Sequence, residues 1–321
     1  MTQGTAAYVA LGERELARRV ASGRELLGPE RCRVCPRACK VDRTGDEAGF
    51  CGIGRHAVVA AHYPHFGEER CLRGTEGSGA VFFSGCGMRC VFCQNHDVSW
   101  TVRGQRVEPP RLAAMMLELQ DRGCHNVNVF TPEHVVPQLL EGLLEGLRGG
   151  LALPLVYNSG SFDGMESLRL LDGVVDVYVP DLKVWTAASA REHLRTPGYR
   201  EAAPAAIREM HRQVGPLVLD DAGLARRGLL VRHLVMPGML DETARVLRWI
   251  AEELGGGTYV NLMAQYTPTG LVSEERFTDI NRPPSRAEYE EAVRIARELG
   301  LNRLDERSQA WGRTLPLSVG P

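Results

Sequence analysis

Six short apolar runs, each separated from the next by a segment of helical length, most constrain how this chain can fold. The runs are AVFFSG (80–85), NVNVF (126–130), LPLVYN (153–158), VVDVYVPDLK (174–183), GLLVRHLVMPG (228–238) and TYVNLMAQY (258–266). Apolar strands that alternate with helices are typical of a parallel sheet with helical crossovers. An open doubly wound sheet and a partial barrel both fit this pattern, and both place the chemistry at the carboxyl ends of the strands.

Helix signals lie between and before these runs. Pro109 and Pro110 begin one helix, Asp241 and Ser285 cap two others, and a further helix is expected over 134–147. A helical lead-in is expected within residues 1–31, whereas residues 32–75, rich in Cys, Gly, Arg and His, predict an irregular region held by metal. We therefore divide the chain into an N-terminal helical and Cys-rich region, 1–79, and a barrel, 80–321.

Composition narrows the class of protein. The chain has 38 Lys and Arg against 40 Asp and Glu, a net charge of -2, so it has no general attraction for nucleic acid or anionic lipid. No run approaches the roughly 18 apolar residues of a membrane helix, and the start of the chain does not resemble a secretion signal. Of nine cysteines, eight lie between Cys32 and Cys93. This crowding indicates metal binding in a reducing compartment, so we expect a cytoplasmic protein. From the charge and the absence of a long apolar run, we expect no nucleic-acid or membrane partner.

The sharpest motif is GCGMRCVFCQN, which follows the first apolar run. It contains Cys86, Cys90 and Cys93 in a C-x3-C-x2-C spacing. Thiolates hold iron–sulfur clusters well, and three of them leave one iron of a four-iron cubane open to a small molecule. The alternative is a structural zinc site, which would need a fourth ligand. Candidates for that ligand are Cys71, His96 and Cys124.

This motif, with Phe92 one place before its last cysteine, resembles the radical SAM superfamily. The segments CRVCPRACKVDR, GFCG, YVPDLK, RHLVMPG and NLMAQY extend the likeness to a branch related to pyruvate formate-lyase activating enzyme. The resemblance implies an α/β fold, a partial (β/α)6 TIM-like barrel with an N-terminal Cys-rich metal-binding extension. It also implies a [4Fe-4S] cluster at Cys86, Cys90 and Cys93 that reductively cleaves S-adenosylmethionine. The resulting 5′-deoxyadenosyl radical abstracts hydrogen from a substrate.

The resemblance also implies roles for single residues. Phe92 is expected near the adenine, and Lys183, with Asp181 in the Asp-x-Lys of the fourth run, is expected to grip the methionine end. Activating enzymes usually carry a Gly-Gly-Glu type motif after the second strand, but this chain reads NVNVFTPEH. Thr131 and Glu133 either supply polar contacts there or cap the next helix.

Other polar residues lie at the predicted strand ends. Asn158, Ser159, Gln265 and Tyr266 are candidates for the cavity, and we count Asn158 and Gln265 among the cofactor-binding residues. His233 falls inside an apolar run, which favours a hydrogen-bonded core histidine over a catalytic one.

A second set of cysteines lies upstream, in C-x2-C-P-R-x-C-x11-C-G. We call Cys32, Cys35, Cys39 and Cys51 the N-terminal cysteines. Four thiols at short spacing fit either a zinc ion or a second iron–sulfur cluster, and the spacing does not decide between them. Cys71, His62 or His65 could replace or join a ligand. An electron-relay role would require the cluster.

These patterns predict a radical SAM enzyme. By resemblance, its substrate is a backbone glycine of a partner glycyl radical enzyme, and its reductant is a protein such as flavodoxin or ferredoxin. A small molecule or a peptide is an alternative substrate. A third hypothesis is a non-catalytic iron–sulfur or zinc protein that carries electrons or binds a partner. The vacancy left by three cysteines separates these classes, because an electron carrier gains from a fully ligated cluster.

Overall fold

Seven parallel strands lie side by side in the order in which they follow one another in the chain. The computed structural model describes residues 5–28 and 32–309. The parallel strands are β2 (Ser78–Phe83), β4 (Val127–Phe130), β5 (Leu155–Ser159), β6 (Val177–Pro180), β8 (Ala225–Leu234), β9 (Tyr259–Met263) and β10 (Arg303–Leu304). A doubly wound sheet reverses its strand order near the middle, so this order confirms the partial barrel. Within the described residues the barrel is open, with β10 at one edge and β3 at the other.

Three further strands are antiparallel to their neighbours. β1 (Ala57–His65) pairs with β2, β3 (Gln105–Val107) pairs with β1, and β7 (Val218–Leu219) pairs with β8. The prediction of irregular structure throughout residues 32–75 is therefore wrong for β1. Most residues of this strand are half-exposed. Its first five residues, AVVAA (57–61), are apolar, but they lie within the segment that we expected to be irregular, and pairing with β2 makes them a strand.

The helices follow the predicted pattern. They are α1 (Ala7–Leu11), α2 (Glu13–Glu25), α3 (Arg70–Arg73), α4 (His96–Ser99), α5 (Pro109–Asp121), α6 (Val136–Arg148), α7 (Met165–Leu170), α8 (Ala187–Glu192), α9 (Tyr199–Val214), α10 (Leu240–Glu253) and α11 (Arg286–Glu298), with 3-10 turns at Thr278–Ile280 and Glu306–Gln309. Ser285 and Glu288 form a capping box at the start of α11, as the sequence signal indicates. The predicted cap at Asp241 is wrong, because α10 begins at Leu240 after Met239 and Asp241 lies in its first turn. Over the described ranges, no helix combines the length and apolar character needed to cross a membrane.

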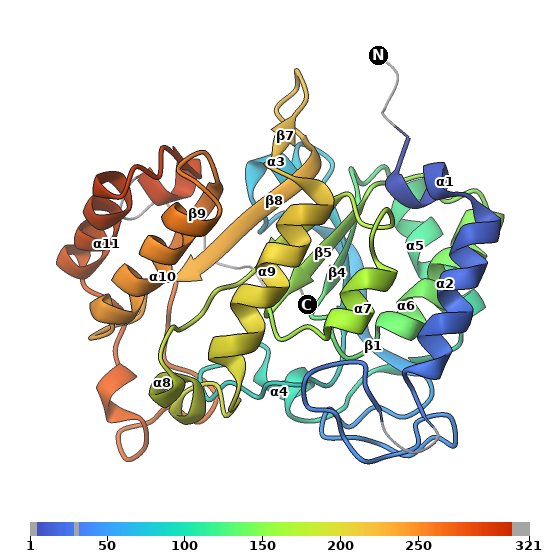
Figure 1. Cartoon of the computed structure of the whole chain (residues 1–321), viewed down its shortest axis with the longest axis horizontal. Coiled ribbons are helices and arrows are strands. Elements are labelled where there is room, and N and C mark those ends of the chain that lie inside the picture. Colours follow the sequence, from blue (N-terminus) through green and yellow to red (C-terminus); the bar gives the residue numbers. More distant parts are fainter. Residues whose placement is uncertain (1–4, 29–31, 310–321) are drawn as a thin grey trace.

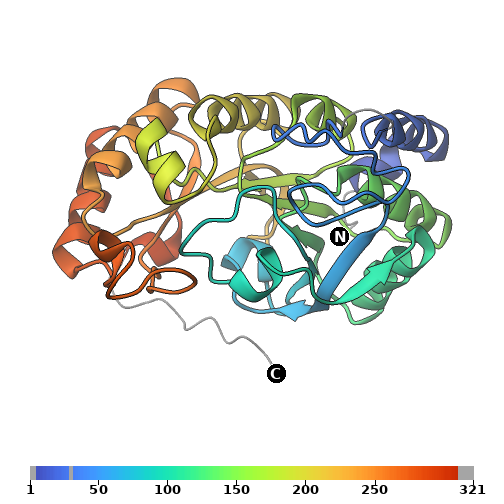
Figure 2. The same cartoon turned by 90° about the horizontal axis from the view of Figure 1, so that it is seen from below.

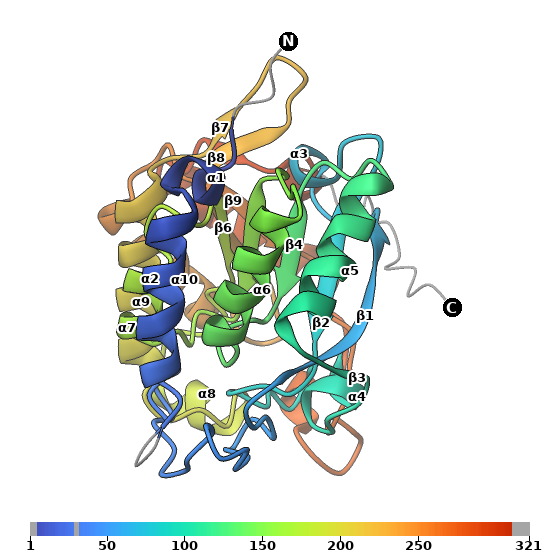
Figure 3. The same cartoon turned by 90° about the vertical axis from the view of Figure 1, so that its right-hand side faces the viewer.

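The main core lies between the helices and the outer face of the sheet. Figure 2 shows helices along an arc around the strands, and Figure 3 shows α5 and α6 outside β2 and β4, with α2 beside α6. Met115 and Met116 of α5 are buried in this core. A Cβ atom on Gly142 would lie 2.7 Å from the side chain of Leu112, so a glycine permits the close approach of α5 and α6.

The segment between β1 and β2 fills one end of the barrel. Cys71 and Leu72 of α3 pack against strand side chains of the interior, which include Val156, Val177, Val179 and Leu230. Beside them, the buried carboxylates of Glu68 and Glu69 bind the guanidinium of Arg232 on β8, at 2.7 and 2.8 Å. In Figure 1, α3 lies at the upper end of the molecule, whereas α4, α8 and the Cys-rich loops lie at the lower end. The filled end leaves the carboxyl ends of the strands as the place for a site.

Candidate functional site

Three free thiols lie in the loop that follows β2. Cys86, Cys90 and Cys93 form what we call the three-cysteine loop. The main-chain N–H of Met88 donates to Sγ of Cys86 at 3.2 Å, and the hydroxyl of Ser99 donates to Sγ of Cys93 at 3.2 Å. Hydrogen bonds to sulfur of this kind tune iron–sulfur centres. The loop therefore already supplies donors to two of its three sulfurs.

The environments of Cys86 and Cys90 disfavour free thiolates. Burial, followed by the carboxyl group of Glu133, raises the pKa of Cys86 to about 12. Burial also raises the pKa of Cys90 above its usual range, and the other two cysteines add to that effect while Lys183 opposes it. A bound metal would have to displace the thiol protons, so binding is coupled to proton release.

The ammonium of Lys183 lies just beyond β6, close enough to Cys90 to influence it. Its Nζ pairs with Oδ2 of Asp181 at 2.5 Å. The hydroxyl of Tyr199 donates to the carbonyl oxygen of Asp181 at 2.9 Å and accepts the N–H of Lys183 at 3.1 Å, which fixes this segment. Burial opposes the charge of Lys183, but Asp181 and Cys90 outweigh it and raise its pKa. In the described part of the chain, the buried Oδ1 of Asp181 has no hydrogen-bond partner, so it can accept from a ligand.

A buried acidic pair lies at the ends of β4 and β5. The carboxyl group of Glu133 accepts the main-chain N–H of Gly160 and the hydroxyl of Ser159, the latter at 3.2 Å. The same hydroxyl contacts Asp163. Burial, and next the charge of Asp163, raise the pKa of Glu133. Because Glu133 also influences Cys86, these acceptors lie beside the three-cysteine loop.

Backbone strain and one close contact mark the same strand ends. Thr131 after β4 and Ser161 after β5 have φ of 36° and 67°. A β-branched residue rarely adopts such a φ, and strain of this kind concentrates at functional sites. A Cβ atom on Gly160 would lie 2.8 Å from Sδ of Met88 and 3.0 Å from Oε1 of Glu133. Glycine at 160 thus lets the three-cysteine loop rest against the end of β5.

The structure places several predicted residues around the three-cysteine loop. Phe92 is buried, and its ring lies edge-on to Tyr266 with centroids 5.9 Å apart. The side-chain amide of Gln94 donates to the carbonyl oxygen of Gln265 at 3.3 Å. The end of β9 therefore touches this loop on both sides of Cys93.

Asn158 and Thr131 are joined to each other at the strand ends. The N–H of Thr131 donates to the carbonyl oxygen of Asn158 at 3.2 Å. The side chain of Asn158 is directed to the barrel interior, where its amide is 3.5 Å from Glu68. Asn158, which we predicted to bind the cofactor, therefore contacts Glu68 of the segment that fills the other end of the barrel.

The N-terminal cysteines are buried or half-buried in loops at the lower end of Figure 1. Burial is the main cause that raises the pKa of Cys35, and the other three N-terminal thiols add to it. The N–H of Phe50 donates to Sγ of Cys39 at 3.4 Å, and the guanidinium of Arg43 donates to Sγ of Cys32 at 3.7 Å. Among residues 5–28 and 32–309, no three His, Cys, Asp or Glu side chains are arranged to hold a single metal ion.

Three of the other candidate ligands, Cys71, His62 and His65, have partners elsewhere. Cys71 packs in the filled end of the barrel. His62 contacts Glu118 at 2.7 Å, and His65 lies 3.8 Å from Glu68. The two cysteine sets are therefore left without these side chains.

Several site residues escaped the sequence analysis, among them Asp163 of the buried acidic pair. Tyr199 begins a helix that carries no motif, and Met88 and Gly160 matter through their mutual contact. A signal existed for Gly160, because Ser159, Gly160 and Ser161 directly follow the third apolar run. No sequence signal indicates Tyr199.

Comparison with known proteins adds one sequence relative. The chain is 31% identical over 279 residues to the uncharacterized protein MJ0674 of Methanocaldococcus jannaschii, covering 84% of this chain and 75% of that protein. No family model matches the chain.

Solved structures match parts of the chain at low identity. Streptococcus suis SuiB bound to S-adenosylmethionine is 10% identical with a TM-score of 0.46, over 68% of this chain and 47% of that one. Methylornithine synthase (PylB) is 16% identical with a TM-score of 0.46, over 69% and 62%. A domain of pyruvate-formate lyase-activating enzyme from Bacteroides vulgatus is 12% identical with a TM-score of 0.36, over 61% and 92%. This chain thus spans less than half of the SuiB chain.

Proposed function

The chain belongs to the same family as the uncharacterized protein MJ0674, and we propose that it is a radical SAM enzyme that cleaves S-adenosylmethionine reductively. One observation carries the proposal. The three thiols, the ammonium of Lys183 and the unpartnered Oδ1 of Asp181 meet at the carboxyl end of the barrel. Three thiolates suit a [4Fe-4S] cluster with one open iron, and a cation beside carboxyl acceptors suits the zwitterionic end of an amino acid.

A cluster at these thiols together with S-adenosylmethionine would supply a 5′-deoxyadenosyl radical that abstracts hydrogen from a substrate. The residues of the chain bind and orient the cofactor and exclude water. Lys183 pairs with the methionine carboxylate. Glu133 and Ser159 accept hydrogen bonds from the amino group, and Phe92 lies beside the adenine.

The remaining predicted residues have supporting places in this proposal. Thr131, Asn158 and Gln265 end the strands around the cofactor, and Asp181 holds Lys183 while its free oxygen accepts from the nucleoside. The N-terminal cysteines hold a second metal group, either zinc or an iron–sulfur cluster.

We propose a backbone glycine of a partner glycyl radical enzyme as the substrate. In the described residues, the sheet is open between β10 and β3, and such an opening suits a polypeptide loop. A small molecule or a peptide is the second candidate. The reductant is a protein such as flavodoxin or ferredoxin, and the reaction takes place in the cytoplasm.

Anaerobically reconstituted protein, reduced with dithionite, is expected to convert S-adenosylmethionine to 5′-deoxyadenosine. Cys90→Ala is expected to abolish this product, whereas Cys124→Ala, at a buried thiol outside both cysteine sets, retains it. A protein that binds iron but shows no spectral change with S-adenosylmethionine would instead be an electron carrier. Deuterium incorporated into 5′-deoxyadenosine from a labelled partner or small molecule then identifies the substrate.

A further inference from the structure

The N-terminal Cys-rich loops lie directly against the three-cysteine loop. A Cβ atom on Gly87 would be 3.5 Å from Sγ of Cys35, so this thiol lies beside the neighbour of Cys86. A Cβ atom on Gly85 would be 2.4 Å from the carbonyl oxygen of Cys51. The two sets of cysteines therefore approach each other across the backbone of residues 85–87.

Two arginines clamp this contact. Nε of Arg37 donates to the carbonyl oxygen of Gly87 at 2.7 Å, and its Nη2 donates to that of Met88 at 3.2 Å. Arg89 reaches back from the three-cysteine loop and donates to the carbonyl oxygen of Phe50 at 2.7 Å. Both guanidinium groups lie over the Phe50 ring, 4.0 and 4.5 Å from its centroid. These interactions hold the two sets of cysteines in a fixed relation.

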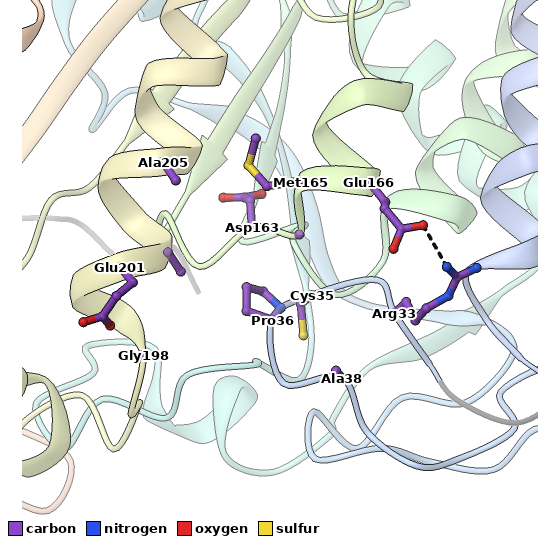
Figure 4. A pocket seen from close by; sticks show the side chains of 12 residues that line it. Arg33, Cys35, Pro36, Ala38, Asp163, Met165, Glu166, Gly198, Glu201 and Ala205 are labelled. Carbon is purple, nitrogen blue, oxygen red and sulfur yellow. Dashed lines mark hydrogen bonds and ion pairs between the residues drawn. The ribbon is translucent and has the colours of Figure 1, made fainter.

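The other side of Cys35 faces a surface pocket. The pocket has a volume of about 600 Å³ and is lined by Arg33, Cys35, Pro36 and Ala38 together with residues of α7 and α9. Figure 4 shows this loop facing the starts of both helices, with Glu166 and Glu201 on those helices. Cys35 thus lies between the molecular surface and Gly87.

We propose that the N-terminal cysteines hold a second iron–sulfur cluster, not zinc, and that this cluster relays electrons to the three-cysteine loop. The relay rests on the proposed function, because its acceptor is the cluster of that loop. A reduced one-electron donor protein of the ferredoxin class gives one electron to the N-terminal site from the side of the pocket. The same site passes one electron across the Gly87 contact toward Cys86, so it returns to its oxidised state and the donor ends oxidised by one electron. Zinc has no redox chemistry, so a zinc ion at the N-terminal cysteines would not pass an electron across this contact.

Metal analysis separates the second cluster from the rest of the proposal. A Cys86→Ala/Cys90→Ala/Cys93→Ala protein, reconstituted anaerobically, is expected to bind about four irons and to give an electron paramagnetic resonance signal on reduction. The wild type and the Cys124→Ala control are expected to bind about eight irons. Zinc without iron in the triple variant would overturn the second cluster. This result requires no S-adenosylmethionine cleavage, so it stands whether or not the proposed reaction occurs.

The relay has its own readouts. In the fully reduced wild type, two paramagnetic clusters in close contact are expected to broaden each other's signals relative to the sum of the single-cluster variants. Arg37→Gln keeps every cysteine and is expected to keep the bound iron, but it removes the clamp on Gly87. In freeze-quenched samples, ferredoxin is expected to reduce the three-cysteine cluster more slowly in this variant. Unbroadened signals, or reduction at the wild-type rate, would overturn the relay.

Discussion

His233 donates a hydrogen bond from Nδ1 to the carbonyl oxygen of Leu182, at 2.7 Å. Its Nε2 lies 2.9 Å from the hydroxyl of Thr243, which can donate to it when the imidazole is neutral. Leu182 lies between Asp181 and Lys183, so a buried histidine of β8 holds the segment that carries this ion pair. His233 is a hydrogen-bonded core residue, as its place in an apolar run predicts, and it acts on the site as a positioning residue.

Buried neutral histidines make the fold sensitive to acid. Burial lowers the pKa of His233 and of His134 to about 4, below the ordinary value near 6.5. Between these two values the unfolded chain binds more protons than the folded one. The free energy of unfolding therefore rises as the pH increases from about 4 to about 6.5. Above about pH 6.5 these two histidines no longer change it. Each histidine contributes up to about 3 kcal/mol.

Substitution of His233 tests this account. The amide of His233→Gln can donate to Leu182 and accept from Thr243, but it does not titrate. Urea unfolding at about pH 7 and about pH 4.5 is expected to show a loss in acid that is about 2–3 kcal/mol smaller in the variant than in the wild type. Equal losses in the two proteins would contradict a depressed pKa at His233.

Lys183 stands out because the chain has two lysines, Lys40 and Lys183, among 38 basic residues. In the proposed function Lys183 pairs with the methionine carboxylate, and Lys183→Ala removes this charge-assisted partner. The affinity of the reconstituted protein for S-adenosylmethionine is expected to fall about 10- to 100-fold, since hydrogen bonds to charged groups contribute about 1.5–3 kcal/mol. Calorimetric titration measures this loss. Lys40→Ala, at an exposed lysine, is the matched control and is expected to bind normally.

The same scarcity of lysine permits a direct spectroscopic check. Reductive methylation with ¹³C-formaldehyde labels the two lysines and the chain amino terminus, and Lys40→Arg assigns one of the lysine signals. S-adenosylmethionine is expected to shift the Lys183 signal and to leave the Lys40 signal in place. A stationary Lys183 signal at saturating cofactor would remove this residue from the site.

Gly160 predicts a steric effect at the same site. A Cβ atom there would lie 2.8 Å from Sδ of Met88 and 3.0 Å from Oε1 of Glu133. Gly160→Ala is therefore expected to displace the three-cysteine loop, cost about 1–3 kcal/mol of stability and weaken cofactor binding. Gly257→Ala is the control, because a Cβ atom on Gly257 meets nothing within 4 Å. Similar melting temperatures and cofactor affinities in the two variants would show that the contact at Gly160 is unimportant.

The sequence predicted those features that short segments encode. Apolar runs located six of the seven parallel strands and missed the two-residue β10. They left the order of the strands open between a doubly wound sheet and a partial barrel, and only the resemblance favoured the barrel. The C-x3-C-x2-C spacing located one candidate metal site, and DLK located Lys183 beside Cys90. Each of these signals lies within a dozen residues of the chain.

The remaining features depend on contacts between distant segments. β1 forms because β2 offers a partner edge, although its own residues show no clear period. Tyr199 reaches Asp181 from a helix 18 residues further along the chain. The approach of Cys35 to Gly87 joins segments that no local pattern connects. Such contacts arise only when the folded barrel brings its loops together.

Arg232 provides a test of the filled end of the barrel. Its guanidinium lies between the buried carboxylates of Glu68 and Glu69, with Asn261 donating to Glu69 at 2.6 Å. Arg232→Met leaves two buried carboxylates without their cation. This change is expected to cost about 3–5 kcal/mol, because breaking one side of a buried ion pair exposes the full cost of burying the other.

Denaturant unfolding measures that cost, and an exposed ion pair is its matched control. Arg286 pairs with Glu290 on the surface of α11, with side chains 71% and 56% exposed. Arg286→Met is expected to change the free energy of unfolding by no more than about 0.5 kcal/mol. If Arg232→Met changed the free energy of unfolding as little as Arg286→Met, the carboxylates of Glu68 and Glu69 would be solvated or protonated in the folded protein. Adding Glu68→Gln and Glu69→Gln to Arg232→Met removes both charges and is expected to recover part of the lost stability, which ties the effect to charge rather than to the volume of the arginine.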